Sequence, residues 1–268
     1  MEGLRGVGLR GIASAVLDLA MPRSCVVCRR PLLLQERFIC LSCLSDLPLT
    51  HFWERPRNPM ADKYNETVHR SLYPDGESSA AQEEIKESYS WAAALFFYSS
   101  ESLYKRIPRH IKYEGGIASG RYFASILGRY LAASEAFADV DLIIPVPLHW
   151  MRRWHRGYNQ ARVLAEAVAA CYASAPAVRT DIVRRHRRTV SQTRVSVESK
   201  SANVRGAFSL CRRFKAPAEG DLPRHILIVD DTFTTGATTN SVREALRTAF
   251  PPSVRISVAT LSFVSSNN

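Results

Sequence analysis

His225-Ile226-Leu227-Ile228-Val229-Asp230-Asp231-Thr232-Phe233-Thr234-Thr235-Gly236-Ala237-Thr238 is the most informative segment of the chain. Its apolar run is mostly β-branched, which is typical of a buried strand in a parallel sheet. Two aspartates end the run, and a hydroxyl-rich turn with one glycine follows. Residues 238–250 then have the pattern of a helix, with Val242, Ala245, Leu246 and Ala249 on one face. The segment therefore predicts an α/β fold in which a parallel strand leads through a polar turn into a helix.

Such a turn is suited to binding a phosphorylated sugar. Its backbone N–H groups can point at an anion, and the N-terminus of the following helix adds positive potential. The adjacent carboxylates of Asp230 and Asp231 can hold vicinal hydroxyls or the water molecules on a Mg²⁺ ion. The alternative is an ordinary strand-to-helix connection with polar residues at the surface.

Residues 226–238 resemble the phosphoribosyl-pyrophosphate (PRPP) motif of type I phosphoribosyltransferases. The resemblance implies that Asp230 and Asp231 are the catalytic pair and face the ribose hydroxyls. It also implies that the turn holds the 5′-phosphate through Thr232, Phe233, Thr234, Thr235, Gly236, Ala237 and Thr238. Ala237 departs from the motif, since many members have a second glycine there.

The length and charge of the chain limit its possible domain organisation and partners. The 268 residues are enough for one large domain, or for a domain with a small module. The formal charge of +11 suits nucleic acid, nucleotide or pyrophosphate partners. No stretch approaches a membrane span, and the first twenty residues lack the apolar core and cleavage site of a secretory signal. We expect a cytoplasmic protein with a short packed N-terminal helix; peripheral membrane contact by that helix is the alternative.

Four cysteines form two Cys-x-x-Cys pairs, Cys25 with Cys28 and Cys40 with Cys43. Four thiolates at this spacing predict a structural Zn²⁺ site. Disulfides would need an oxidising compartment, and a redox dithiol would need only one pair. Cys171 and Cys211 have the pattern of ordinary buried cysteines.

The sequence predicts that the chain is divided into three regions. Residues 1–50 would form the N-terminal helix and zinc module, and the proline-containing residues 51–88 a linker or irregular connection. Residues 89–268 would form the main domain. Within it we expect strands over 91–98, 140–147 and 255–263, and helices over 102–113 (broken at Pro108), 118–133 and 159–172.

Two segments of the chain are basic. Arg152, Arg153 and Arg156 lie just after the strand over 140–147, where open α/β sheets bind ligands, so they are candidates for holding pyrophosphate or nucleic acid. Residues 184–188 are also basic and lead into an excursion over 184–205, with a short helix expected near 196–203. A solvated charge run is the alternative for both segments.

Four pieces together resemble the ComF family: the cysteine pairs, His-Ile-Lys-Tyr-Glu-Gly at 110–115, Pro-Val-Pro with Arg-Gly-Tyr-Asn-Gln at 145–160, and Ser-Gln-Thr-Arg with Asn-Val-Arg-Gly-Ala-Phe at 191–208. The similarity covers residues 25–263. It implies a type I phosphoribosyltransferase-like parallel sheet flanked by helices, with a small zinc-binding module before it. ComF proteins are known from natural transformation, or as predicted phosphoribosyltransferases without an agreed substrate. The chain departs from members with a longer double zinc ribbon, and residues 74–87 resemble an insertion.

Two functions follow. In the first, the protein is an enzyme that transfers phosphoribosyl from PRPP, with Mg²⁺, to an unidentified acceptor and releases pyrophosphate. Arg152, Arg153 and Arg156 would receive the pyrophosphate, and the 184–205 excursion would close as a lid. In the second, it is a non-catalytic protein that binds PRPP or single-stranded DNA in DNA uptake, with competence proteins as partners. Arg152, Trp154, Arg156 and residues 184–188 would then contact the strand.

Overall fold

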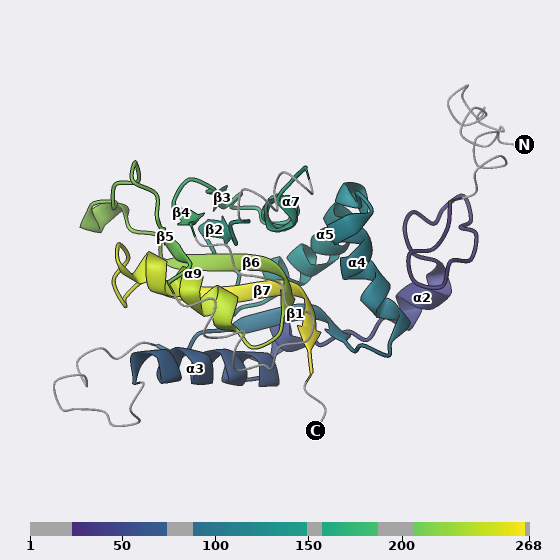
Figure 1. The fold of residues 1–268 in the computed structure, drawn as a ribbon, viewed down its shortest axis with the longest axis horizontal. Helices are drawn as coiled ribbons and strands as arrows, with labels where there is room; N and C mark the ends of the chain where they lie inside the picture. The colour runs from purple at the N-terminus through teal and green to yellow at the C-terminus, as the bar shows by residue number, and fades with distance from the viewer. Residues whose placement is uncertain (1–22, 74–87, 149–156, 187–205, 266–268) are drawn as a thin grey trace, which may run out of the picture.

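The computed structural model describes residues 23–73, 88–148, 157–186 and 206–265 (Figure 1). Its centre is a five-stranded parallel sheet with the order β1-β7-β6-β2-β3. The strands are β1 (Ala92–Tyr98), β7 (Arg255–Val264), β6 (His225–Phe233), β2 (Leu142–Pro145) and β3 (Ala177–Val178). The central strands β6 and β7 are buried almost throughout, as expected for a sheet covered on both faces. The predicted α/β class and the three further strands are confirmed.

Four helices cover the two faces of the sheet (Figure 1). Contacts place α5 (Ile117–Ala133) and α7 (Gln160–Ala169) on one face, and α3 (Pro59–Leu72) and α9 (Ala237–Arg247) on the other. The helices α5 and α7 touch at Gly128, where a Cβ atom would lie 2.9 Å from both Cys171 Sγ and Val168 Cα. Only a glycine permits this approach.

The strand β6 extends beyond its predicted end. The sequence predicted that the acidic pair, Asp230 and Asp231, ends the strand, but the strand continues to Phe233. The reason is its neighbour β7, which pairs Thr260 with Asp230 and Ser262 with Thr232. Backbone hydrogen bonding to a longer partner keeps a polar segment extended, although its side chains no longer form an apolar run.

The prediction of an irregular connection over residues 51–88 is wrong for its first part, which is largely helical. A short 3₁₀ helix, η1 (Phe52–Glu54), is followed by α3 (Pro59–Leu72). The side chain of Asn58 accepts hydrogen bonds from the N–H groups of Met60 and Ala61, and Pro59 occupies the first helical position, so α3 has a strong start signal. One face of α3 is buried through Met60, Ala61, Tyr64 and Val68. Residues 74–87 lie outside the described residues.

Pro108 does not break a helix. A 3₁₀ helix, η3 (Leu103–Lys105), precedes α4 (Arg106–Tyr113), and Pro108 lies in the first turn of α4. Proline is tolerated there because the first turn has no intrahelical acceptor for its missing N–H. The predicted helix over 118–133 is confirmed as α5, and the helix predicted over 159–172 is shorter, as α7.

The remaining described elements lie at the two ends of the sheet. A two-stranded antiparallel ribbon is formed by β4 (Val183–Arg185) and β5 (Phe208–Leu210), and η4 (Glu219–Asp221) is a short 3₁₀ turn. The four-cysteine module, residues 23–47, contains α2 (Leu41–Ser45) and packs on α4 and α5. The Tyr104 hydroxyl donates to the Cys43 carbonyl (3.0 Å), and the Arg106 guanidinium donates to the Val27 carbonyl (2.5 Å).

No helix in the described ranges has both the length and the apolar character that crossing a membrane needs. The predicted N-terminal helix falls outside those ranges.

Candidate functional site

The acidic pair lies at the carboxyl end of β6, in the central part of the sheet. Asp230 accepts a hydrogen bond from the N–H of Asp231 through Oδ1 (2.8 Å). The Asp231 carboxylate is largely buried and forms an ion pair with Lys112, with Nζ 2.9 Å from Oδ1. The hydroxyl of Thr232 lies 3.4 Å from the same Nζ and accepts from Ser262 Oγ (3.1 Å). Two carboxylates therefore share one nearby lysine.

Lys112 is the site residue that sequence reasoning missed. It comes from the last turn of α4, far from β6 in the sequence, and its segment was recognised only as part of a family resemblance. The signal was its place in the His-Ile-Lys-Tyr-Glu-Gly piece, but no periodicity in the sequence connects that piece with β6. Only the folded structure, in which α4 lies beside the end of β6, brings Lys112 to the acidic pair.

The electrostatics of the pair are unequal. Burial, and then the adjacent Asp231 carboxylate, raise the pKa of Asp230 to about 7. The Asp231 N–H and the cationic Lys112 and Arg185 act in the opposite direction without cancelling the effect. The site therefore favours a cation, because binding one stabilises the ionised form of Asp230.

The turn after β6 places a helix N-terminus next to the acidic pair. Gly236 has a φ of +79° and caps α9. A Cβ atom on this glycine would lie 2.9 Å from Phe233 Cζ, so both the backbone angle and the space require glycine. The first N–H groups of α9 have no acceptor within the helix, and such groups can bind an anion. The Ala237 N–H donates to Thr235 Oγ1, at a long 3.4 Å.

The helix α3 contacts the same turn and holds it in place. The Thr67 hydroxyl is 2.9 Å from the carbonyl oxygens of both Lys63 and Thr235, and it shares its proton between them. The ring of Tyr64 packs on Phe233 with 6.3 Å between centroids. Ser71 Oγ donates to Glu244 of α9 (2.6 Å). The segment predicted as an irregular connection thus fixes the turn of the candidate site.

A second strand end lies beside the first, as the sequence predicted. In the register of β2 and β6, Pro145 is opposite Val229, and the Val146 N–H donates to the Val229 carbonyl (2.9 Å). After the loop, the Tyr158 hydroxyl donates to the carbonyl of Ile111, next to Lys112 in α4. Two pieces of the family resemblance therefore meet in space. The loop arginines Arg152, Arg153 and Arg156, together with Trp154, lie outside the described residues.

The second basic segment is only partly described. In the β4–β5 ribbon, the guanidinium of Arg184 donates to Ser209 Oγ (3.3 Å) and that of Arg185 lies over the Phe208 ring at 5.2 Å. His186 lies 3.4 Å from Ser209 Oγ through Nδ1. The other two arginines of this segment, the rest of the predicted 184–205 lid and the short helix expected near 196–203 lie outside the described residues.

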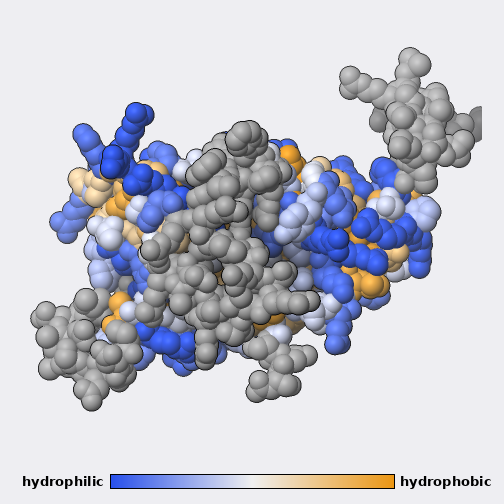
Figure 2. All heavy atoms as spheres, in the orientation of Figure 1, coloured by the Kyte–Doolittle hydropathy of each residue, from blue (hydrophilic) through white to orange (hydrophobic). Residues whose placement is uncertain are grey.

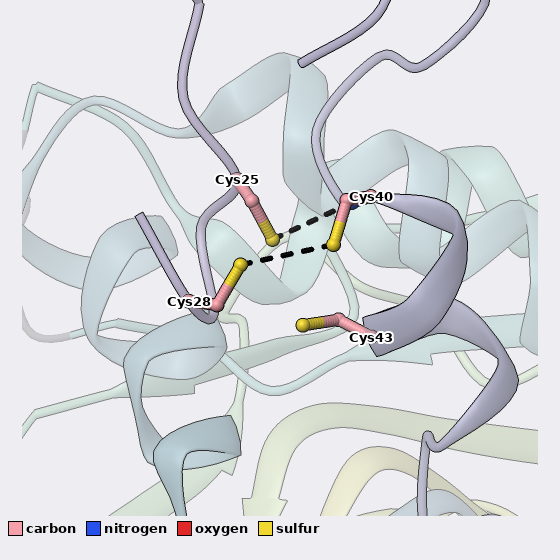
Figure 3. A group of neighbouring side chains, drawn as sticks. All are labelled: Cys25, Cys28, Cys40 and Cys43. Atoms are coloured by element: carbon pink, nitrogen blue, oxygen red, sulfur yellow. Dashed lines mark hydrogen bonds between the residues drawn. The ribbon is translucent and has the colours of Figure 1, made fainter. Parts of the chain in front are cut away.

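The four paired cysteines converge on one point. Their sulfur atoms lie within 4.8 Å of one another and point inward from the 25–28 turn and from the start of α2 (Figure 3). Cys28 Sγ and Cys40 Sγ are 3.7 Å apart, and the Cys40 N–H donates to Cys25 Sγ (3.4 Å). A tetrahedral zinc site with Zn–S bonds of about 2.3 Å places its sulfurs about 3.8 Å apart. The four cysteines can therefore hold a metal ion such as zinc.

The thiols differ in acidity. Burial raises the pKa of Cys25, but N–H groups of the surrounding backbone, with Cys28 first, outweigh it and lower that pKa to about 7. Burial and hydrogen bonding with the neighbouring thiols raise the pKa of Cys43. Four thiols this close cannot all ionise without a cation between them, and this is the chemistry of a thiolate metal site.

Comparison with known proteins gives the family. Competence protein F of Haemophilus influenzae is 31% identical over 169 residues, which are 61% of this chain and 70% of the relative. The chain belongs to the ComF family. Competence protein ComFC of Streptococcus pneumoniae is 28% identical over 156 residues, 58% of this chain and 61% of the relative. No family model matches the chain.

A further relative matches this chain over a shorter stretch of sequence. DNA utilization protein YhgH of Escherichia coli is 34% identical over 109 residues, which are 40% of this chain and 43% of that protein. The chain thus matches less than half the length of this relative. For this ComF family member, the structure brings together Asp230, Asp231, Lys112 and the turn that leads into α9, and separately brings together the four cysteines.

Proposed function

We propose that the protein binds PRPP with Mg²⁺ at the carboxyl end of β6 and transfers its phosphoribosyl group to an acceptor, releasing pyrophosphate. The observation that carries the proposal is an acidic pair, with Asp231 buried and ion-paired to Lys112 and Asp230 half-buried, directly before a glycine-capped helix N-terminus. The pair suits ribose hydroxyls and hydrated Mg²⁺, and the helix N-terminus suits a phosphate.

Each part of the site would have a separate task. Asp230 and Asp231 would hold the sugar, and their negative charge would favour the cationic character that the ribose gains in the transition state. The 5′-phosphate would be bound by the turn from Thr232 to Thr238. Bound Mg²⁺ would supply charge neutralisation at the leaving pyrophosphate. Arg152, Arg153 and Arg156 remain our candidates to bind that leaving group.

Lys112 would have two positions. In the ligand-free protein it lies 2.9 Å from Asp231 and reduces the repulsion between the two carboxylates. When a divalent cation accompanies the substrate, the carboxylates no longer need the lysine as their partner. The ammonium group would then be available to an oxygen of the pyrophosphate.

A structural zinc and a cytoplasmic location belong to the same proposal. Zinc bound by Cys25, Cys28, Cys40 and Cys43 would stabilise a module with a small core of its own. Thiols kept free for a metal suit a reducing compartment.

A second candidate function is supported by the names of the relatives. Competence protein F is named for competence, and DNA utilization protein YhgH is named for the use of DNA. In this alternative the protein binds PRPP or single-stranded DNA without catalysing transfer, as one component of DNA uptake acting with competence proteins.

Calorimetry with PRPP and Mg²⁺ tests the first proposal. The double variant Asp230→Asn, Asp231→Asn should lose most of the PRPP affinity, whereas Asp181→Asn, which changes an exposed aspartate paired with Arg179, should not. Equal affinity in the double variant and the unchanged protein would contradict the assignment. Pyrophosphate release with a panel of acceptors then separates the two candidates, because a PRPP-binding protein that releases none is non-catalytic.

A further inference from the structure

An open groove lies between the four-cysteine module and α5, away from the acidic pair. Its volume is about 630 Å³, within the range of ligand pockets. One wall comes from the module and the other from one side of α5. The lining residues are Arg23, Arg37, Phe38, Ala118, Arg121, Tyr122, Ser125 and Arg129. In the view of Figure 2, hydrophilic residues cover most of the neighbouring surface over α4 and the module.

The groove is strongly cationic. Four of its eight lining residues are arginines, and none of the eight is acidic. The carboxylate of Glu36, next to Arg37 in the sequence, is not part of the lining and accepts the N–H groups of Leu33 and Leu41 at 2.7 Å each. Across the described ranges, Arg37, Arg121 and Arg129 form no ion pair, and all three are exposed. Their charges are therefore directed at solvent or at an external anion.

The arginines are arranged along a line. Arg121, Ser125 and Arg129 recur every four residues on α5, which places them on one stripe of the helix. At a rise of 1.5 Å per residue, Arg121 and Arg129 are separated by about 12 Å along the axis. Arg37 lies on the opposite wall. A row of charges of this length suits a chain with several phosphates better than a single small anion.

Two aromatic rings accompany these cations. Phe38 of the module and Tyr122 of α5 are partly exposed, and their ring centroids are 5.6 Å apart. Cations that track a backbone, combined with aromatic faces on which bases stack, are the features of proteins that bind single strands without sequence preference.

We propose that this groove binds single-stranded nucleic acid, with Arg37, Arg121 and Arg129 on the phosphates and Tyr122 or Phe38 against a base. The proposal rests on the DNA-binding candidate described above and gives it a binding surface other than Arg152, Trp154, Arg156 and residues 184–188. It does not depend on PRPP binding, since the groove contains none of the residues of the β6 site. The two ligands should therefore bind independently.

Fluorescence anisotropy with a labelled oligothymidylate of about twenty nucleotides tests the location. The triple variant Arg37→Ala, Arg121→Ala, Arg129→Ala should bind at least about tenfold more weakly at 50 mM salt. Its slope of log affinity against log salt should become shallower by about two, from about 0.7 per lost phosphate contact on a single strand. PRPP binding, measured by calorimetry on the same samples, should be unchanged and shows that the variant is folded.

A matched control removes the same charge elsewhere. Arg212→Ala, Arg213→Ala, Lys215→Ala takes three exposed cations from the segment after β5. An equal loss in this control would mean that only net charge matters, and would overturn the location. Full oligothymidylate affinity in the groove variant, or displacement of the oligonucleotide by saturating PRPP and Mg²⁺, would overturn it as well.

The stacking part has its own test. Tyr122→Ala should weaken oligothymidylate binding by about 5- to 150-fold, the equivalent of one lost stacked base, while Tyr122→Phe should keep it. Polyglutamate serves as the competitor without bases. If polyglutamate displaces the oligonucleotide at equal charge and Tyr122→Ala has no effect, the groove is a general polyanion site and the proposal for nucleic acid is wrong.

Discussion

Replacing Asp230 by asparagine should stabilise the ligand-free protein at alkaline pH. The folded state raises the pKa of Asp230 from 3.8 to about 7, through burial first and then through the charge of Asp231. Between these two values the folded state holds a proton that the unfolded state has released. By linkage, the free energy of unfolding therefore falls as pH rises through this window, and the full penalty is present above about pH 7.

The size of this destabilisation follows from the difference between the two pKa values. At about 1.4 kcal/mol per pH unit, the ionised carboxylate destabilises the fold by at most about 4 kcal/mol at pH 8, and by less than half of that at pH 5. Asparagine keeps an oxygen that can accept the Asp231 N–H, now bound at 2.8 Å. Its amide group brings two donors that need partners, so we expect a net gain on the order of 2 kcal/mol at pH 8.

Urea denaturation at pH 5 and pH 8, with zinc held constant, measures this gain. Lys112→Met is the companion variant, because it removes the cation 2.9 Å from Asp231 and should destabilise the protein more at pH 8 than at pH 5. Asp181→Asn, which leaves the site untouched, should show no gain at pH 8. The reasoning fails if Asp230→Asn is less stable than the unchanged protein at pH 8, or if its gain is the same at both pH values.

Three further predictions concern the module and the turn. Purified protein should contain about one zinc per chain by elemental analysis, and Cys28→Ser should lower both the zinc content and the melting temperature. Thr67→Val removes the hydrogen bond to the Thr235 carbonyl; PRPP affinity by calorimetry should fall several-fold, in line with about 1 kcal/mol for a buried hydrogen bond. Gly236→Ala should cost about 1–3 kcal/mol in urea denaturation, because φ is +79° and the new Cβ would lie 2.9 Å from Phe233 Cζ; equal stability would contradict the strained turn.

The parts that sequence predicted well depend on local patterns. A β-branched run followed by two aspartates and a glycine turn specifies a buried strand, its polar end and the next helix within fourteen residues. The cysteine pairs specify their own cluster in the same way, since two Cys-x-x-Cys turns need only face each other. In both cases the information lies in neighbouring residues.

The parts that sequence missed depend on contacts between distant segments. Lys112 belongs to the site only because α4 packs beside the end of β6. The extra length of β6 is set by its pairing with β7. The helix α3 had local signals in Asn58 and Pro59, but the neighbouring prolines and polar residues outweighed them, and its buried face is recognisable only once α9 and β1 are in place.

The charged groups at the two ends of β6 differ in how they are paired, and this difference supports our proposal for the ligand site. At the amino end, His225 is fully buried, with Nδ1 2.8 Å from Asp139 and Nε2 2.8 Å from Ser257 Oγ. Burial lowers the pKa of His225 despite the opposing effect of Asp139, so the neutral imidazole donates to the carboxylate and accepts from the serine.

That array has the composition of a hydrolase triad but cannot act as one. Ser257 is completely buried, so no substrate reaches its hydroxyl. Asp139 is also held by Arg255 (3.2 Å), whose guanidinium lies 4.5 Å from the centroid of the Trp91 ring. The charges of Asp139 and Arg255 therefore have partners within the protein, and the array stabilises the sheet. At the carboxyl end, the Asp231 carboxylate pairs with Lys112, while burial and then the charge of Asp231 raise the pKa of Asp230 despite the nearby Lys112 and Arg185. A cation that arrives with a phosphorylated ligand would supply positive charge beside Asp230, which is why we assign the ligand to the carboxyl end of β6.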